Sequence, residues 1–196
     1  MNTNFKKIKH LQRHLRNTEA SGILLSTADH VDYITSYQSV MDGWHLTEPL
    51  SAVFVPANSI QKCTLFLPEA SLIGLVVASR TEHPIYFEEL RTFELLNFCI
   101  TARAEDAHLA LDNELLTELN HYSELVGGTC AKDIIESIAE FLQDQDLSNE
   151  KILFDDMRVA LSMNHKSGQR YGDGLDVMFR TRSIKTPEEI KLIVES

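Results

Sequence analysis

Hydrophobic positions follow two different periods along the chain, and each period predicts a type of element. Short apolar runs that end at Gly, Pro or polar turn residues predict strands. Such runs occupy residues 23–25, 52–55, 63–67, 84–87, 152–154 and 175–179. Apolar residues three or four positions apart predict an amphipathic helix over residues 4–17, namely Phe5, Ile8, Leu11 and Leu15.

Further helices are predicted where a capping residue precedes apolar positions of helical spacing. Asp29 caps the first of these, and Pro68 with Glu69 suits the first turn of another that runs to about Ser79. Residues 88–126 are rich in Leu, Glu and Ala, and we expect them to be mostly helical.

The second half of the chain is divided by glycines. A strong helix is predicted from Thr129, just after the Gly127-Gly128 break, to about Gln145. A shorter helix is expected near residues 157–164, and residues 168–174 read as a loop.

Short strands that alternate with helices predict an α/β sandwich. The strands at 52–55 and 63–67 flank turn residues and are expected to form a hairpin, which makes the predicted sheet mixed. With 196 residues, 43% of them hydrophobic, the chain can bury a core without disulfides.

The last residues form the clearest helix start in the sequence. Thr186 and Glu189 have the spacing of a capping box, and Pro187 occupies the first helical position. Ile190, Ile193 and Val194 then begin an apolar face, but the sequence stops at Ser196. We therefore expect this helix to belong to a longer protein.

The charge balance excludes some partners. There are 29 Asp and Glu residues against 18 Lys and Arg residues, a formal net charge of −11, so nucleic acid is not an expected partner. The polar N-terminus lacks a signal peptide and no apolar run is long enough for a bilayer, so we expect a cytoplasmic protein that contacts no membrane. Three cysteines without CxxC spacing favour reduced thiols.

Four groups of residues could carry chemistry. His10 and His14 have the i, i+4 spacing of a metal site, although solvated surface histidines explain them better. Cys130 follows Gly127-Gly128-Thr129, a sequence that could activate a thiol or hold a phosphate at a helix N-terminus, but ordinary helix capping explains it better.

Asp155 and Asp156 form the third group, as paired carboxylates at a strand end. They could bind a metal or act as acid and base, but we favour Asp156 as the cap of the following helix. The fourth group is the polar loop that contains Asp42, Trp44 and His45. An exposed aromatic residue in such a loop indicates contact with a ligand, and packing of Trp44 over the sheet edge is the alternative.

The closing segment carries a family resemblance. Residues 180–190 resemble the junction of the Xaa-Pro peptidase/creatinase family, where an R-x-I-K-[ST]-x-x-E-[IL] segment joins the N-terminal domain to the first helix of the catalytic domain. The matching positions are Arg182, Ile184, Lys185, Thr186, Glu189 and Ile190.

Other family landmarks fall in the expected order. Residues 21–25 look like the first strand, and residues 33–37 resemble a Y-L-[ST]-G-[YF] stretch with Ser36 in place of glycine. Residues 151–155 resemble an R-I-G-[VF]-[ED] strand with Leu153 in place of glycine. Residues 88–128 depart from the pattern because they are longer and more helical than expected there.

The resemblance implies a fold and a domain division. The expected fold is α/β, a three-layer sandwich of a mixed sheet flanked by helices, similar to the ribonuclease H-like arrangement. Residues 1–182 would be the N-terminal domain, and residues 183–196 a linker with the first helix of a catalytic domain that lies beyond this sequence.

It also implies a function for the longer protein. Relatives hydrolyse Xaa-Pro peptide bonds, or related bonds of creatine or ectoine, with two divalent metal ions held by Asp, Asp, His, Glu and Glu of the catalytic domain. This chain would then hold no catalytic residue, metal ligand or cofactor of its own, and would not turn over a peptide. The full protein is expected to be a homodimer acting on a peptide or small amide. Asp42, Trp44 and His45 would contribute to substrate binding in the partner subunit.

Two other interpretations remain open. The chain could be a stand-alone α/β module that binds a ligand or protein through residues 38–49. It could also be a small thiol hydrolase that uses Cys130 or Cys99.

Overall fold

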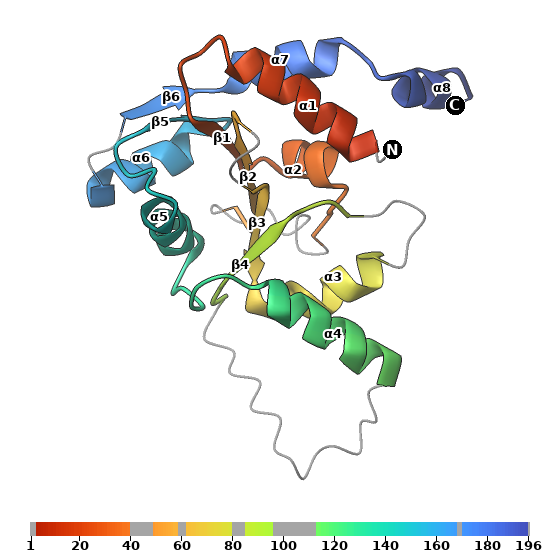
Figure 1. Ribbon diagram of the computed structural model, residues 1–196, viewed down its shortest axis with the longest axis vertical. Helices are drawn as coiled ribbons and strands as arrows, with labels where there is room; N and C mark the ends of the chain where they lie inside the picture. Colours follow the sequence, from red (N-terminus) through yellow and green to blue (C-terminus); the bar gives the residue numbers. More distant parts are fainter. Residues whose placement is uncertain are drawn as a thin grey trace.

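The computed structural model describes residues 3–39, 49–58, 62–79, 85–95, 113–167 and 170–195. These residues form a six-stranded sheet in the order β4-β3-β2-β1-β5-β6 at the centre of the molecule (Figure 1). The strands are β1 (Gly22–Leu25), β2 (Ala52–Pro56), β3 (Thr64–Pro68), β4 (Glu89–Phe93), β5 (Lys151–Phe154) and β6 (Arg170–Asp173).

The sheet is mixed, as predicted. Strands β1, β2 and β3 pair as an antiparallel meander, which confirms the predicted β2–β3 hairpin. Strand β5 pairs in parallel with β1, β6 in parallel with β5, and β4 in parallel with β3. Within this sheet, β2 alone runs opposite to the other strands.

Helices cover both faces of the sheet (Figure 1). Helices α1, α2, α3, α4 and α7 contribute to the core on one face, and α5 and α6 to the core on the other. Their bounds are α1 (Thr3–Leu15), α2 (Ala28–Thr35), α3 (Leu72–Ser79), α4 (Asn113–Leu125), α5 (Ile134–Asp144), α6 (Met157–Ser167) and α7 (Leu175–Ser183), and α8 (Pro187–Glu195) follows at the end of the described chain. A short 3-10 turn, η2 (Glu69–Ser71), precedes α3.

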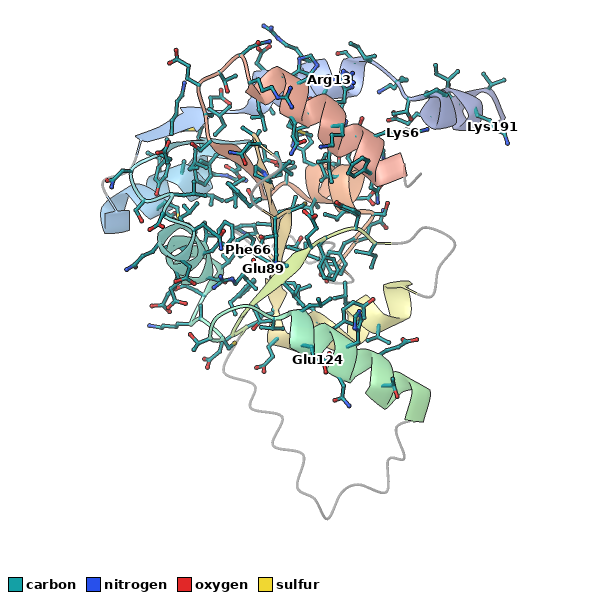
Figure 2. All side chains as sticks on the ribbon, in the orientation of Figure 1. Lys6, Arg13, Phe66, Glu89, Glu124 and Lys191 are labelled. Atoms are coloured by element: carbon teal, nitrogen blue, oxygen red, sulfur yellow. The ribbon has the colours of Figure 1, made fainter. Side chains whose placement is uncertain are left out.

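Alternation along the strands separates the two cores. Ile23 and Leu25 of β1 face the α1 side of the sheet, whereas Leu24 between them faces α5 and α6. On that second face the ring centroid of Phe141 lies 5.1 Å from that of Phe54 and 5.3 Å from that of Phe66. Phe66 is labelled in Figure 2. Two apolar cores on opposite faces of one sheet confirm the predicted three-layer sandwich.

The region of residues 88–126, which we expect to be mostly helical, contains a strand. The predicted strand at residues 84–87 is wrong, because residues 85–87 have no regular structure and β4 forms at Glu89–Phe93. Leu90 enters one core and Phe93 the other, and the strand pairs along its whole length with β3. Pairing with an existing strand thus overrides the helical preference of Glu, Leu and Arg. The helical prediction is confirmed for α4.

The second correction concerns the start of the helix that follows Gly127 and Gly128. Helix α5 begins at Ile134 rather than at Thr129, and Asp133 is its N-cap, with a side chain that accepts a hydrogen bond from the amide of Glu136 at 2.7 Å. Before that cap the chain is extended, because Ala131 forms a bridge with Phe93 of β4. A better cap four residues later therefore defines the start of the helix.

The third correction concerns residues 168–179. The predicted loop contains β6, and the predicted strand at residues 175–179 is the start of α7. Val177, Met178 and Thr181 of α7 are buried while Phe179 is 61% exposed, which is a helical rather than an alternating pattern. Five apolar or mixed residues are too few to distinguish the two periods from sequence.

Candidate functional site

The carboxyl ends of β1 and β5 lie side by side at the switch point of the sheet. Helix α2 follows β1 and packs on one face, whereas α6 follows β5 and packs on the other face. In open α/β sheets this change of side leaves a crevice where ligands bind. The polar residues at this point are therefore the first candidate site.

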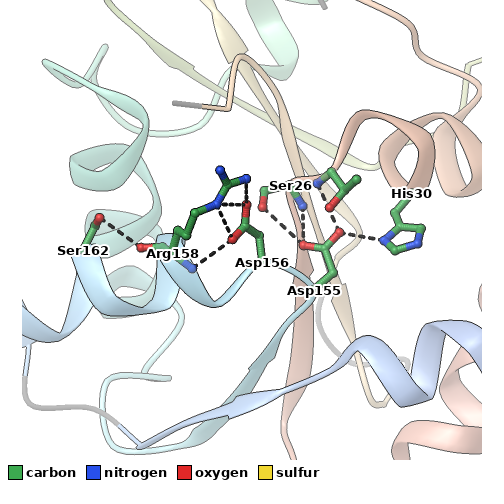
Figure 3. Close-up of polar contacts among 7 residues, drawn as sticks. Ser26, His30, Asp155, Asp156, Arg158 and Ser162 are labelled. Atoms are coloured by element: carbon green, nitrogen blue, oxygen red, sulfur yellow. Dashed lines mark hydrogen bonds and ion pairs between the residues drawn. The ribbon is translucent and has the colours of Figure 1, made fainter. Parts of the chain in front are cut away.

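Asp155 is the centre of that cluster (Figure 3). Its Oδ1 accepts hydrogen bonds from the amide of Ser26 at 2.8 Å and from the Ser26 hydroxyl at 3.2 Å. Its Oδ2 accepts from the amide of Thr27 at 3.1 Å and from Nδ1 of His30 at 2.8 Å. Because a carboxylate only accepts hydrogen bonds, this contact places a proton on Nδ1 of the imidazole.

Both members of the Asp155–His30 pair are buried. His30 is 6% exposed and Asp155 is 9% exposed. A carboxylate has about four acceptor positions, and here all of them are used inside the protein. Asp155 therefore has no free oxygen for a metal ion or a substrate proton, and it organises the turn between β1 and α2.

Asp156 has a separate role, as predicted. Its side chain accepts a hydrogen bond from the amide of Arg158 at 2.9 Å, and its carbonyl accepts from the amide of Val159 at 3.2 Å, so it caps α6. The Arg158 guanidinium, 2.6 Å away, lowers the pKa of Asp156 (Figure 3). The two carboxylates thus bind different groups and form no acid–base pair.

The predicted substrate-binding residues Asp42, Trp44 and His45 lie outside the described residues. The chain returns at residues 49–51 and enters β2, whose residue Val53 pairs with Leu25 at the end of β1. The described chain therefore enters β2 at the end of the sheet where Asp155 lies. The predicted role of these three residues stays a prediction.

At Cys63 and Cys130, the two cysteines that the structure describes, the geometry does not support a thiol nucleophile. Cys130 is exposed and lies four residues before α5, so no helix N-terminus activates it. Partial burial raises the pKa of its thiol, a hydrogen bond with Thr92 opposes this rise, and the Glu69 carboxylate, 3.9 Å from Sγ, adds to it. Complete burial raises the pKa of Cys63, with a smaller contribution from Glu88. Cys99 lies outside the described residues.

Gly127 and Gly128 accommodate an arginine rather than a phosphate. Arg91 of β4 is buried and bonds to Glu89 and Asp144, each at 2.8 Å. A Cβ atom on Gly128, which has a φ of 73°, would lie 2.3 Å from Nη1 of Arg91. The glycines are needed because the ion pair of Glu89 and Arg91 occupies the space where their side chains would be.

His10 and His14 meet on the surface of α1. Their Nε2 atoms are 3.3 Å apart and their ring centroids 4.9 Å apart. Partial burial, His14 and Arg13 lower the pKa of His10. Among the described residues, no group of three or more His, Cys, Asp and Glu side chains could hold a metal ion.

Tyr33 is the centre of a second polar cluster, which we call the junction cluster: Lys7, Tyr33, Arg182 and Glu189. The Lys7 ammonium lies 4.5 Å and the Arg182 guanidinium 5.5 Å from the centre of the Tyr33 ring. Burial, followed by the charge of Glu189, raises the pKa of Tyr33 to about 12. A cavity of about 340 Å³ opens beside the ring, between α1, α2 and α7.

The same Glu189 closes the predicted capping box of α8. Its Oε2 accepts a hydrogen bond from the amide of Thr186 at 2.7 Å, and its own amide donates to Oγ1 of Thr186 at 3.2 Å. One carboxylate therefore begins α8 and also faces α1 and α2. The sequence predicts the capping box but not the junction cluster, because the members of the cluster come from four helices.

Within the described chain, no helix is long and apolar enough to cross a membrane. No family model matches the sequence, and no curated protein is significantly similar to it.

Several solved structures share the fold. The Xaa-Pro dipeptidase of Bacillus anthracis aligns with a TM-score of 0.55 and 13% identity, over 99% of this chain and 40% of that chain. A dipeptidase of Pyrococcus horikoshii OT3 aligns with a TM-score of 0.54 and 17% identity, over 94% of this chain and 38% of that one. For the aminopeptidase P of Streptococcus thermophilus, an Xaa-Pro aminopeptidase, the TM-score is 0.52 and the identity 11%, over 92% of this chain and 99% of that one.

These similarities confirm the fold that the resemblance implied, since identities this low show the fold alone. The chain spans about two fifths of the length of the two dipeptidases, 40% and 38%.

Proposed function

We propose that this chain is the non-catalytic N-terminal domain of a metal-dependent Xaa-Pro peptidase or creatinase-like amidohydrolase. The observation that carries the proposal is the fold similarity to the Xaa-Pro dipeptidase, which extends over 99% of this chain and only 40% of that one. A chain that corresponds to two fifths of an enzyme is expected to need the remaining part for catalysis.

Among the residues that the structure describes, the donor groups do not fit a site for two divalent metal ions. Such a site needs several free carboxylates together with a histidine. Asp155, the most central carboxylate, is fully engaged by Ser26, Thr27 and His30. We therefore assign the metal ions, and the residues that bind them, to a catalytic domain after residue 196.

The proposed role of the domain is to shape the substrate entrance and the dimer interface of a homodimer. Asp42, Trp44 and His45 would contact the substrate in the partner subunit. Trp44 would stack on a proline-like ring, and His45 would hydrogen-bond to a carboxylate of the peptide. The described chain resumes at residue 49 and enters β2 beside the carboxyl end of β1, and this position supports the proposed role.

The junction cluster gives the domain a way to position a catalytic domain. Glu189 of α8 faces Lys7 and Tyr33, and Arg182 lies just before the turn into α8. The charge of Glu189 in the first turn of α8 therefore acts on side chains of α1 and α2. A catalytic domain that continues from α8 would therefore inherit a defined orientation.

Peptide hydrolysis by two forms of the protein tests the proposal. The 196-residue chain is expected to cleave no Xaa-Pro dipeptide in the presence of Mn²⁺, Co²⁺ or Zn²⁺, whereas the protein extended beyond residue 196 should cleave it. Hydrolysis by the 196-residue chain alone would overturn the non-catalytic assignment.

The role of the loop is tested separately in the extended protein. Trp44→Ala should lower kcat/KM about tenfold or more, as expected for the loss of an aromatic contact with substrate. Phe179→Ala is the matched control, because Phe179 is also aromatic and is exposed on α7. Unchanged kinetics for Trp44→Ala would remove the loop from the substrate site.

A further inference from the structure

The two histidines of α1 converge through one nitrogen each. Nε2 of His10 and Nε2 of His14 are 3.3 Å apart, and both rings are partly exposed on the same side of the helix. Leu11 and Leu15 bury the other side of α1 in the core. The backbone that carries the pair is therefore packed against the core.

The separation of the two nitrogens fits a shared metal ion. Zinc binds imidazole nitrogens at about 2.0–2.1 Å with tetrahedral geometry, which places two ligand nitrogens about 3.3–3.4 Å apart. The Nε2 atoms, which share a hydrogen bond, have this separation, and a bound ion would take the place of the shared proton. Two histidines at i and i+4 are also the helical spacing that metalloproteases use to bind zinc.

Charged groups of both signs lie around the pair. Burial, the neighbouring His14 and the cation Arg13 lower the pKa of His10, while Glu189 of α8 opposes them. Arg13, labelled on α1 in Figure 2, is exposed and disfavours a nearby cation, and Glu189 favours one. A neutral imidazole is the form that ligates a metal.

We propose that His10 and His14 form a two-histidine binding site for a divalent transition-metal ion such as Zn²⁺ on the exposed side of α1. Each ring supplies Nε2, and water molecules complete the coordination. The site is separate from the two metal ions that the proposed function assigns to a catalytic domain. It concerns this chain alone and does not depend on that function.

Two protein ligands make a site of modest affinity, because structural zinc sites use four. Loss of either ring leaves a single ligand. We therefore expect each single substitution to weaken binding about tenfold or more, in line with loss of a metal-binding contact. Binding of the ion should also stabilise α1, since the site needs the helix to be formed.

Titration calorimetry with Zn²⁺ alone tests the site. His10→Gln and His14→Gln should each weaken Zn²⁺ binding about tenfold or more, and ring proton resonances of both histidines should shift in the wild type. His121→Gln is the control for an exposed histidine elsewhere, on α4, and should leave the affinity unchanged.

A rearranged variant keeps the number of histidines constant. His14→Gln with Arg16→His moves the second ring to the i+6 position, where it cannot meet His10. This variant should bind Zn²⁺ as weakly as His14→Gln. The proposal is wrong if the rearranged variant or both single variants bind Zn²⁺ as well as the wild type, or if the wild type binds no better than they do. Circular dichroism confirms that the variants remain helical.

Discussion

Nδ1 of His30 donates a hydrogen bond of 2.8 Å to Oδ2 of Asp155, although 125 positions separate the two residues in the sequence. The bond joins the end of β5 to the first turn of α2. Asp155 also holds the amides of Ser26 and Thr27, so one carboxylate defines how the chain leaves β1. The switch point of the sheet is therefore closed by a structural contact.

Substitution of Asp155 should be among the most destabilising single changes in this domain. Asp155→Ala leaves the amides of Ser26 and Thr27 and the ring of His30 without their acceptor, at a cost of about 3–5 kcal/mol. His30→Ala removes one bond and should cost about 1–3 kcal/mol. Guanidinium denaturation measures both.

A matched control is available at the end of β6. Asp173 is exposed and accepts a bond from the amide of Leu175, so Asp173→Ala should cost about 1 kcal/mol. A cost for Asp155→Ala no larger than that for Asp173→Ala would contradict the assignment of Asp155 as the organising residue.

The cap at Asp156 gives a pH dependence of known sign. Its pKa is lowered below 3.8 chiefly by the side-chain hydrogen bonds of Arg158, so the folded state prefers the ionised carboxylate. The stabilisation is complete above pH 3.8 and is lost as the pH falls through the folded-state pKa. Asp156→Ala should cost about 1 kcal/mol at neutral pH and less at lower pH.

Denaturation of the wild type and of Asp156→Ala at about pH 7 and about pH 3 measures how the cost of the substitution changes with pH. Asp156→Asn is the control, because it keeps a capping oxygen without the charge. An Asp156→Ala penalty that grew toward acid pH would have the wrong sign for this cap.

The two described thiols should be inert at neutral pH. The pKa values of Cys63 and Cys130 are both raised, so little thiolate forms there. In a Cys99→Ser background, iodoacetamide should modify Cys63 only on unfolding, and the exposed Cys130 more slowly than free cysteine. Modification of Cys130 faster than free cysteine would restore the thiol-hydrolase alternative.

Removal of the Glu189 charge should loosen the start of α8. Glu189→Gln should weaken the interaction with Lys7 and lower the pKa of Tyr33 from about 12, because the charge of Glu189 helps to raise it. Carbon NMR of the labelled tyrosine ring gives that pKa, and hydrogen exchange gives the protection of the Thr186 amide. Tyr33→Phe is the control, since the ring that contacts Lys7 and Arg182 remains. Equal protection in wild type and Glu189→Gln would show that the junction cluster does not hold α8.

Sequence alone predicted the elements with long, clear periods. The helix at residues 4–17, the β2–β3 hairpin and the α8 capping box agree with the structure, because each depends on local pattern and turn chemistry. Strand β4 and the start of α7 were missed, because pairing with β3 and packing against α1 decide them, and neither is visible in a short window.

At two positions this sequence has another residue where the family pattern has glycine, and the structure explains both. Ser36 stands where the family stretch has glycine, and it has a φ of 59° as the C-cap of α2, a left-handed position that glycine favours. Leu153 stands in place of another glycine, and Gly172 and Gly174 of the neighbouring chain segment leave room for its side chain. A Cβ on Gly172 would lie 2.9 Å from Cδ2 of Leu153.

The candidate site was harder to predict. Paired carboxylates at a strand end made Asp155 a candidate, but nothing in the local sequence pointed to His30. The partnership depends on the parallel register of β1 with β5, in which Leu24 lies beside Phe154. A single sequence carries no record of that register.

The proposal that this chain is one domain of a larger metal-dependent hydrolase has a direct test. The coding sequence after the codon for Ser196 should be determined, and its product assayed for metal-dependent Xaa-Pro hydrolysis. We expect a second domain with spaced Asp, Asp, His, Glu and Glu residues, and activity that a chelator removes. A stop codon directly after Ser196 would contradict the proposal and favour a stand-alone binding module.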